Sequence, residues 1–532
     1  MIEVNPSRFK FKPYAHQLAG VKTLLKKPIY GLFWKMRLGK TKAIIDTACI
    51  LFEAGVIDTL LVVGPKQVTD IWLDKNLGEI VTHNWSKARP YEYKEYRSLF
   101  LPDFQPCYVV AGVEFLRQQG PRDDFPYVND LLAALRGRKV WFVFDEGSVL
   151  GNWSSQQTKA MIDLRNGDVI GRVSLLDGTP RGNSHLTFYS KFKFLDKAIL
   201  ACKSFYHFRA KFSETTKKAH QWKRDGAGNF LLNDKGNRIP ERTHVVVVSE
   251  KNQEEFARRT APFCEFLEQD VLDMPKKVPG ILTAKLDEKA WGVYCQMRDE
   301  LVAEIDSGVC AVSHAAVKCI RLAQICAGFL GGVQEHTQQQ FEGMLDDAGI
   351  LWRGDYAAPI TKEIHDAPTK MLMGWLKLKL EEDKDFKAVI WCRFVPEIVR
   401  LSLEMMKVLS TFEYGVKSSE TDTYENQLHP RSKYQGPYIL VCQPQTAQYG
   451  NNFSRARTSI FLSQDYNRVT RAQAGDRVQA DGAGATTLEL DVLVTGPRGQ
   501  KTIVHDIVAS VRGKEEAEKR TAQAWKKVLM EE

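Results

Sequence analysis

Trp34-Lys35-Met36-Arg37-Leu38-Gly39-Lys40-Thr41 lies between an apolar run at 29–33 and a helix-forming segment that begins at Lys42. This order predicts a strand, a tight loop and a helix, with Gly39-Lys40-Thr41 at the end of a phosphate-binding loop. Backbone N–H groups at the start of the helix would hold the phosphates. The Lys40 ammonium would reach the β- and γ-phosphates, and the Thr41 hydroxyl would hold Mg²⁺.

The first glycine of the usual loop pattern would stand at position 34, where this chain has tryptophan. Gly-Lys-Thr without that glycine also occurs in ordinary turns before helices. The assignment of the loop therefore depends on the rest of the chain.

Length and composition set broad limits on the protein. A chain of 532 residues holds two to four domains, and 44% hydrophobic with 26% charged residues is ordinary for a soluble globular protein. The sequence contains no apolar run of membrane-spanning length and no signal peptide at its N-terminus, and its ten cysteines form no Cys-x-x-Cys. We therefore expect neither a zinc site nor a disulfide framework, and a cytoplasmic location. The net charge of +9 permits a polyanionic partner without requiring one.

Short apolar runs in the first half of the chain end in polar residues, glycine or proline. Strands of this kind, alternating with helices, indicate a parallel sheet whose site lies at the carboxyl ends of the strands. The runs are 59–63, 107–111, 139–144 and 172–176.

Asp145 and Glu146 directly follow the third run. Two adjacent carboxylates at the end of a buried strand suit ATP hydrolysis, with Asp145 toward Mg²⁺ and Glu146 toward the attacking water. The alternative is an exposed acidic turn. Upstream of the loop, Gln17 has an amide that both donates and accepts, as the reading of adenine requires. The alternative for Gln17 is a polar position on an amphipathic helix.

Three segments together resemble motifs I, II and III of superfamily 2 helicases, most closely the Swi/Snf-type branch. They are 35–41, Asp145-Glu146-Gly147-Ser148 and Asp177-Gly178-Thr179-Pro180. The resemblance implies nucleotide contacts from Arg37, Gly39, Lys40 and Thr41, and nucleic-acid contacts from Lys66 in motif Ia and Gly112 in motif Ib. The usual Asp-Glu-Ala-His reads Asp-Glu-Gly-Ser here, which puts in doubt the usual link from that motif to the second domain.

The second half of the chain resembles motifs IV to VI of the same family. Arg393 matches motif IV, Gly450 and Asn452 match motif V, and Gln473 and Arg477 match motif VI. The resemblance implies that Arg393 and Asn452 contact nucleic acid, that Gly450 and Gln473 contact the nucleotide, and that Arg477 is catalytic.

The second arginine of motif VI would stand at position 480, which is alanine. Either Arg477 or a neighbour, Arg468 or Arg471, takes its role, or ATP hydrolysis is slow or absent.

The remaining segments give expectations about architecture. We expect an N-terminal domain at 1–280, whose irregular part at 182–280 contains an inserted hairpin at 225–238, and a C-terminal domain at 281–532. Within the second domain we expect helices at 286–305 and 311–329, a loop at 331–358, and a β-hairpin at 488–503 followed by a helix at 513–529.

The resemblance as a whole implies two tandem RecA-like α/β domains with parallel sheets and an ATP cleft between them. It implies a DNA-dependent ATPase that uses ATP and Mg²⁺ to translocate on or remodel DNA, with duplex favoured and bound through phosphates. Two alternatives stay open: a strand-separating helicase on forked or branched DNA, and a catalytically weakened ATP- and DNA-binding scaffold or inhibitor. The compact length resembles bacteriophage-encoded members, which would act in the host cytoplasm. The sequence indicates no membrane partner and does not identify protein partners.

Overall fold

The chain forms two compact units in a computed structural model. The first unit comprises Met1–Leu272 with Ala517–Glu532, and the second comprises Asp273–Glu516. The predicted boundary between residues 280 and 281 falls inside a strand of the second unit. The structure describes residues 4–76, 78–94, 105–222, 231, 240–268, 271, 276–300, 302–305, 308–311, 315–335, 360–408, 413–417, 427–430, 432–447, 452–478 and 486–531.

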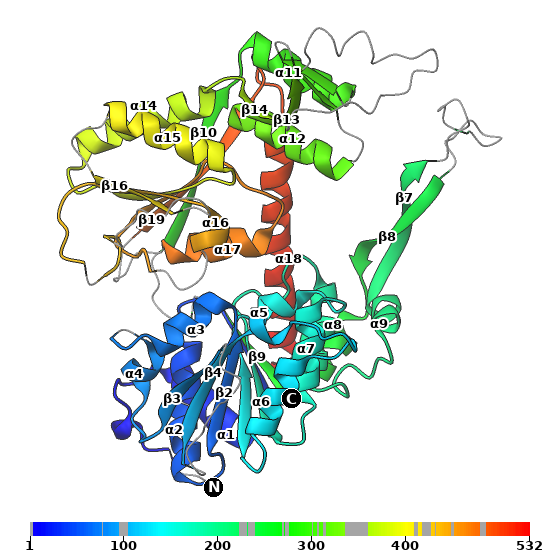
Figure 1. Ribbon diagram of the computed structural model, residues 1–532, viewed down its shortest axis with the longest axis vertical. Coiled ribbons are helices and arrows are strands. Elements are labelled where there is room, and N and C mark those ends of the chain that lie inside the picture. Colours follow the sequence, from blue (N-terminus) through cyan, green and yellow to red (C-terminus); the bar gives the residue numbers. More distant parts are fainter. Residues whose placement is uncertain are drawn as a thin grey trace. The chain divides into compact units, whose positions relative to one another are not determined.

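The first unit is built on a seven-stranded sheet in the order β3-β4-β2-β5-β6-β1-β9, in which every neighbouring pair is parallel (Figure 1). The four apolar runs are β2, β4, β5 and β6, which confirms the predicted parallel sheet. The strands are β1 (Ile29–Trp34), β2 (Thr59–Gly64), β3 (Arg89–Tyr93), β4 (Cys107–Gly112), β5 (Val140–Phe144), β6 (Ile170–Leu176) and β9 (Cys264–Leu267).

Helices cover both faces of this sheet, which explains why its strands are apolar along their whole length. Alternate residues of β2 belong to different cores: Leu61 and Val63 lie in one, and Leu60 and Val62 in the other. Helices α6, α7 and α8 build the first core, and α1, α2 and α3 build the second. The helical segments are η1 (Pro6–Arg8), α1 (Ala15–Lys26), α2 (Lys40–Glu53), α3 (Lys66–Leu73), α4 (Glu79–His83), α5 (Val113–Leu116), α6 (Pro126–Ala134), η2 (Gly147–Gly151), α7 (Gln156–Arg165), η3 (His185–Thr187), α8 (Phe188–Leu195), α9 (Phe205–Phe212), α10 (Gln253–Thr260) and η4 (Ala261–Phe263).

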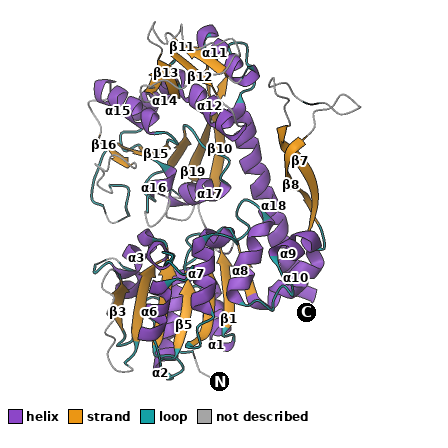
Figure 2. Cartoon of the chain, turned by 45° about the vertical axis from the view of Figure 1, so that its right-hand side comes forward, coloured by secondary structure: helices purple, strands orange, loops and turns teal. Residues whose placement is uncertain are grey.

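A two-stranded antiparallel ribbon interrupts the first unit between α9 and α10. It consists of β7 (Ser213–Trp222) and β8 (Pro240–Glu250), and Figures 1 and 2 show it extending from α9. The hairpin predicted at 225–238 lies outside the described residues except for residue 231, whereas the observed arms flank that segment on both sides. The stretch 182–280 is thus more regular than predicted, with helices, the ribbon and β9.

The second unit contains a six-stranded sheet in the order β10-β19-β18-β15-β17-β16, again parallel throughout. Val389 and Ile390 of β15 face different cores, one bordered by α17 and the other by α14 and α15. The protein therefore has two RecA-like α/β domains in tandem. The elements are β10 (Lys276–Lys285), α14 (Ala367–Glu382), β15 (Lys387–Trp391), α15 (Val395–Val408), β16 (Glu413–Lys417), β17 (Tyr438–Cys442), α16 (Pro444–Ala447), β18 (Thr458–Phe461), α17 (Arg468–Arg477), β19 (Thr486–Thr495) and α18 (Ile503–Glu531).

A smaller sheet corrects the prediction of a helix over 286–305. Helix α11 (Glu288–Asp299) ends earlier, and β11 (Val302–Ile305) pairs with β12 (Gly308–Ala311), which in turn pairs with β13 (Phe329–Glu335). The β-branched residues Val302 and Ile305 suit a strand better than a helix end. Helix α12 (Ala315–Ala327) and β14 (Ile360–Glu363) complete this region, and most of the predicted loop at 331–358 lies outside the described residues.

The β-hairpin predicted at 488–503 is wrong. Strand β19 has parallel partners on both sides, β10 and β18, so neither edge is open to a returning strand. A turn follows, in which the Gly496 N–H donates to Gln500 O at 2.9 Å, and the chain enters α18 at Ile503. Among the described helices, none is long and apolar enough to cross a membrane.

Candidate active site

The loop between β1 and α2 has the backbone of a tight turn into a helix N-terminus. Arg37 and Gly39 both have positive φ, 67° and 76°, and Gly39 is the residue before the first residue of α2. The positive φ favours glycine at this position, and a Cβ on Gly39 would lie 2.1 Å from Gln17 Nε2 and would displace that amide. Lys40 and Thr41 are the first two residues of α2, where backbone N–H groups have no partner within the helix.

Helix α1 supports this loop through two side chains that reach the same carbonyl. Gln17 Nε2 donates to Leu38 O at 3.1 Å, and His16 Nε2 lies 2.8 Å from that oxygen, which can only accept. The Gln17 amide oxygen accepts from the Tyr14 N–H at 3.1 Å, and the side chain is 4% exposed. Gln17 therefore joins α1 to the loop, and an adenine contact would use its second N–H and second lone pair. That contact stays a prediction.

Trp34 occupies the place of the missing first glycine without crowding the loop. The Trp34 ring is fully buried, and its Nε1 donates to Glu265 Oε2 at 2.8 Å. The ring also packs closely on α1, because a Cβ on Gly20 would lie 2.6 Å from the ring. The side chain therefore points into the core. The carbonyls of Trp34 and Lys35 instead face the Lys40 ammonium, which donates to them at 2.8 and 3.3 Å.

Asp145 and Glu146 follow β5 at the carboxyl edge of the sheet. Trp72 Nε1 donates to Asp145 Oδ2 at 2.9 Å, and the Glu146 N–H donates to Asp145 Oδ1 at 2.9 Å. Burial raises the pKa of Asp145, against the opposing effects of the Trp72 hydrogen bond and the Lys40 charge. Glu146 has φ 61°, a left-handed backbone unusual for glutamate, and such strained residues concentrate at functional sites.

The segment after β6 packs directly beneath these carboxylates. A Cβ on Gly147 would lie 2.9 Å from Asp177 Oδ2, and a Cβ on Gly178 would lie 3.0 Å from Met36 of the loop. The three segments that resemble motifs I, II and III are thus in contact, at the ends of β1, β5 and β6. In the sheet order β6 stands between the other two strands.

Lys191 is a site residue that the sequence did not reveal. Its ammonium donates to Asp177 Oδ2 at 2.6 Å and to Pro180 O at 2.7 Å, and both charged side chains are fully buried. The pair fixes the segment after β6 against α8. The only sequence signal is a lysine amid the aromatic residues of α8, which is too common to identify a partner.

A second ion-pair group ties this segment to the ribbon. Arg181 pairs with Glu250, the last residue of β8, and His185 Nδ1 lies 3.3 Å from Glu250 Oε1. Burial alone would raise the pKa of Glu250, but the hydrogen bonds from His185 and Arg181 and their charges lower it to about 2. His185 Nε2 also meets Ser213 Oγ at 2.7 Å, at the start of β7.

Lys66 and Gly112, predicted to contact nucleic acid, lie together at the same sheet edge. The Lys66 N–H donates to Glu114 Oε2 at 3.0 Å, and a Cβ on Gly112 would lie 3.9 Å from Lys66 Cα. Lys66 comes just after β2, and Gly112 is the last residue of the neighbouring strand β4. In the sheet order β2 stands beside β5, so Lys66 and Gly112 lie at the same sheet edge as Asp145 and Glu146.

The predicted residues of the second unit are divided between the two ends of its sheet. Arg393 follows β15 at the carboxyl end, whereas Asn452, which precedes β18, and Arg477, whose carbonyl accepts from the Phe453 N–H at 2.9 Å, lie toward the amino end. The Arg393 N–H, after β15, donates to Ser463 Oγ at 2.7 Å, and Gln473 and Arg477 belong to α17. Asn452 Oδ1 accepts from the Ser454 N–H at 3.0 Å. Gly450 lies outside the described residues.

The two arginines proposed as substitutes at position 480 are buried inside the second unit. Arg471 donates to Asp491 Oδ1 at 3.0 Å, pairs with Glu489 at 2.9 Å and stacks on the Phe461 ring. Arg468 is 2% exposed, whereas Arg477 is half-buried. Arg477 is the most accessible of the three, and Ala480 lies outside the described residues.

The donor atoms fit a magnesium ion shared with a nucleotide better than a metal held by protein alone. Within the described residues of the chain, no group of three or more His, Cys, Asp or Glu side chains could hold a metal. Thr41 and Asp145 offer one hydroxyl and one carboxylate. Mg²⁺ takes such oxygen ligands together with phosphates and water.

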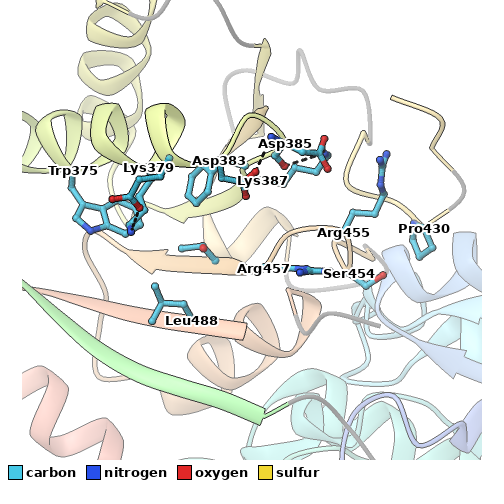
Figure 3. Close-up of a pocket in the computed structure, with 13 residues that line it drawn as sticks. Trp375, Lys379, Asp383, Asp385, Lys387, Pro430, Ser454, Arg455, Arg457 and Leu488 are labelled. Carbon is cyan, nitrogen blue, oxygen red and sulfur yellow. Dashed lines mark hydrogen bonds and ion pairs between the residues drawn. The ribbon is translucent and has the colours of Figure 1, made fainter. Parts of the chain in front are cut away.

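The second unit also has an open cleft of about 730 Å³ at the amino ends of its strands, lined by Lys379, Lys387, Arg455 and Leu488 among others (Figure 3). Lys379 and Lys387 pair with Glu382 and Asp385. Arg455 donates to three backbone carbonyls. This cleft lies at the opposite end of the strands from Arg393, which follows β15.

The fold is that of an α/β protein with two RecA-like domains, the first of which has a tight loop between β1 and α2. No model of a protein family matches the chain, and no curated protein matches it. Among solved structures, the chain is similar to a Sulfolobus solfataricus SWI2/SNF2 ATPase core in complex with dsDNA, with a TM-score of 0.39, 16% identity, and coverage of 92% of this chain and 90% of that one. It is similar at the same TM-score and identity to a Sulfolobus solfataricus SWI2/SNF2 ATPase core domain, over 92% of this chain and 87% of that one. Similarity at this level supports no statement about activity.

Proposed function

We propose that the protein is a DNA-dependent ATPase motor of the Swi/Snf type, which hydrolyses ATP to translocate on or remodel DNA. The observation that carries the proposal is the meeting of three segments at one sheet edge: loop 34–41, Asp145-Glu146 and the segment from Asp177. A phosphate loop beside paired carboxylates suits ATP hydrolysis. The second parallel sheet distinguishes this arrangement from that of a metabolic kinase.

Each residue of the first unit has a defined task in this proposal. N–H groups at the start of α2 bind phosphate oxygens, and the Lys40 ammonium, already poised over the loop, neutralises charge on the β- and γ-phosphates. Thr41 and Asp145 would hold Mg²⁺, whose charge adds to this neutralisation. The Glu146 carboxylate orients the attacking water and accepts its proton.

The tasks of the second unit come from the resemblance and stay predictions. Arg477 would stabilise charge on the transferring phosphoryl group, and Gln473 and Gly450 would contact the nucleotide, held in a cleft between the domains. Lys66, Gly112, Arg393 and Asn452 would contact DNA phosphates, with duplex favoured. The bacteriophage origin and the cytoplasmic location are likewise predictions.

The two rival functions make different use of the same elements. A strand-separating helicase is favoured by the β7–β8 ribbon, which pairs with no other strand among the described residues and could act as a wedge between the strands of a duplex. A scaffold with weak catalysis is favoured by Ala480 and by the burial of Arg468 and Arg471. One assay distinguishes the motor from the scaffold.

The experiment is steady-state ATP hydrolysis by the purified full chain, alone, with single-stranded DNA and with duplex DNA, at low and moderate salt. We expect stimulation by duplex that falls as salt rises, because phosphate contacts release counterions. Lys40→Ala should reduce turnover to background. Glu146→Gln should bind ATP but hydrolyse it on the order of 10²-fold more slowly or worse.

Lys22→Ala is the matched control, because it removes one positive charge from an exposed position on α1 without touching the loop. Normal turnover in Lys40→Ala would remove Lys40 from the site. If the wild-type chain bound ATP and DNA but hydrolysis stayed at background, the scaffold function would replace the motor, and Ala480→Arg would test whether the missing arginine is the cause.

A further inference from the structure

An aromatic cluster stands outside the nucleotide site of the first unit, between the carboxylate segment and the ribbon. Trp153 follows η2, which begins one residue after Glu146. The Trp153 ring stacks on Phe205 at 5.1 Å and 16°, and the Tyr206 ring meets it edge-on at 5.9 Å and 74°. Phe205 in turn packs edge-on against Tyr189 of α8 at 5.6 Å, so the cluster has a fixed inner side.

The outer side of this cluster is accessible. Trp153 is 36% exposed and Tyr206 is 60% exposed, which is unusual for two neighbouring large aromatic side chains. The Arg209 guanidinium lies over the rings of its neighbours on α9, 5.4 Å from the Tyr206 centroid and 5.9 Å from the Phe205 centroid. We call Trp153, Phe205, Tyr206 and Arg209 the aromatic platform.

The chain around the platform is basic. Residues 197–213, which include all of α9, contain the four cations Lys197, Lys203, Arg209 and Lys211 and no aspartate or glutamate. One of these, Lys211, pairs with Glu255 of α10 at 2.7 Å. The platform therefore combines flat aromatic faces with a local excess of positive charge.

This combination fits one kind of partner. The bases of single-stranded nucleic acid expose π-faces that stack on aromatic rings and on guanidinium groups, while its phosphates are attracted to nearby cations. A duplex keeps its bases stacked inside the helix and offers no such faces to a protein surface. We propose that the aromatic platform binds the bases of single-stranded nucleic acid by stacking. The proposal rests on the proposed function, since it names the form of DNA held by one face of the motor.

The platform lies between the segment that carries the carboxylates and the ribbon, so bound single-stranded nucleic acid would be next to both. Its Trp153 is joined to Glu146 by the short segment η2, and its helix α9 ends at Phe212, directly before β7 begins at Ser213. Figure 1 shows α9 at the foot of β7 and β8. A single strand bound at the platform would therefore lie next to the ribbon and close in sequence to the segment that carries the carboxylates.

The test is binding of the full chain, without ATP, to two fluorescently labelled oligomers of equal length: oligothymidylate and an abasic oligomer with the same phosphates. We expect the wild-type chain to bind oligothymidylate more tightly. Tyr206→Ala and Trp153→Ala should each weaken that binding by roughly 5- to 100-fold, the range for loss of one stacked base, and should leave abasic binding unchanged.

Two further variants test whether the loss of binding is due to the aromatic rings of the platform. Tyr206→Phe retains the ring and should bind like the wild type. Phe11→Ala removes a 53% exposed aromatic side chain elsewhere in the same unit and should change neither affinity. Because Tyr206 is largely exposed, its alanine variant should fold even if Trp153→Ala does not.

Equal wild-type affinity for the two oligomers would overturn the proposal, and so would an unchanged preference in Tyr206→Ala. The outcome is independent of the ATPase assay. Duplex-stimulated hydrolysis without base-dependent binding would retain the motor and remove the platform, whereas base-dependent binding without hydrolysis would do the reverse.

Discussion

Gly147 shows how one missing methyl group holds two segments of the site together. The resemblance leads one to expect alanine at this position, yet a Cβ there would lie 2.9 Å from both Asp177 Oδ2 and Leu175 Cδ1. The neighbours cannot yield easily, because Asp177 is fixed by the buried Lys191 and Leu175 is fully buried in β6. Glycine is therefore the residue that lets Asp145-Glu146 and the segment after β6 come into contact.

We predict that Gly147→Ala destabilises the first unit by about 1–3 kcal/mol, the usual cost of overpacking, and lowers ATP hydrolysis. Urea denaturation of the full chain, with and without the substitution, would measure the loss. Gly171→Ala is the matched control, because its Cβ would have only Val140 O within reach, at 3.9 Å. Equal midpoints for the two variants would show that the site accommodates the methyl group.

At the scale of elements, the start of α15 contains a buried acid. Glu397 is 2% exposed, and its Oε2 accepts hydrogen bonds from the Phe394 N–H at 3.2 Å and from Ser463 Oγ. Burial raises the pKa of Glu397 from 4.5 to about 7, although these hydrogen bonds and the charges of Arg400 and Arg393 oppose the rise. At a pH between about 4.5 and about 7, the folded state therefore binds more protons than the unfolded state. The stabilising contribution is therefore present below about pH 4.5 and is lost as the pH rises through about 7.

We predict that Glu397→Gln stabilises β15 at pH 8 relative to the wild type and that the difference shrinks toward pH 5. The amide oxygen still accepts both hydrogen bonds but carries no charge. Hydrogen exchange of peptides that cover Lys387–Trp391, compared between variant and wild type at each pH, measures the effect locally. Glu404→Gln on the same helix should show no such trend, and a pH-independent difference in Glu397→Gln would contradict the ionisation.

Elements also show which regions of the fold a sequence can reveal. Strands buried on both faces, such as 59–64 and 140–144, were predictable because they are continuous apolar runs. The edge strand β3 was missed because Arg89–Tyr93 is mostly polar. The periodicity of 302–305 predicts a helix, although its β-branched residues favour the observed strand. The hairpin predicted at 488–503 fails because tertiary pairing with β10 and β18 occupies both edges of β19.

The residues of the candidate site also differ in whether the sequence alone can identify them. The loop and the two carboxylates can be proposed from the sequence because they are contiguous motifs. The ion pairs that hold the neighbouring segment, Lys191 with Asp177 and Arg181 with Glu250, join residues that are separated in the chain. No spacing pattern in the sequence predicts these pairs.

At the scale of the whole molecule, the two sheets differ in how far apart in the sequence their strands lie. Every strand of the first sheet lies between residues 29 and 267. In the second sheet, the first strand pairs with the last, since Lys276 of β10 is in register with Thr486 of β19. Strand β18 also takes β19 as a neighbour.

We predict that a chain ending at residue 485 keeps the seven-stranded sheet of its first unit folded and loses the second unit, because β10 and β18 lose the strand that joins them. Limited proteolysis with mass spectrometry should then leave a resistant fragment that ends near residue 272. A chain ending at residue 516 is the matched control, since it retains β19 and the first half of α18 and should protect both units. A resistant fragment over 276–478 from the shorter chain would contradict this dependence.

The pairing of β10 with β19 also sets the order in which the two units can fold during synthesis. As the chain leaves the ribosome, β10 emerges about 200 residues before its partner. At about 5–20 residues per second this interval lasts roughly 10–40 s. The seven-stranded sheet of the first unit can fold within it, whereas β10 must wait with an unpaired edge. That strand carries Val278 and Ile281, which stay 44% and 52% exposed even in the finished protein. The completion of the second unit, and with it of any motor, is therefore limited by the pace of translation.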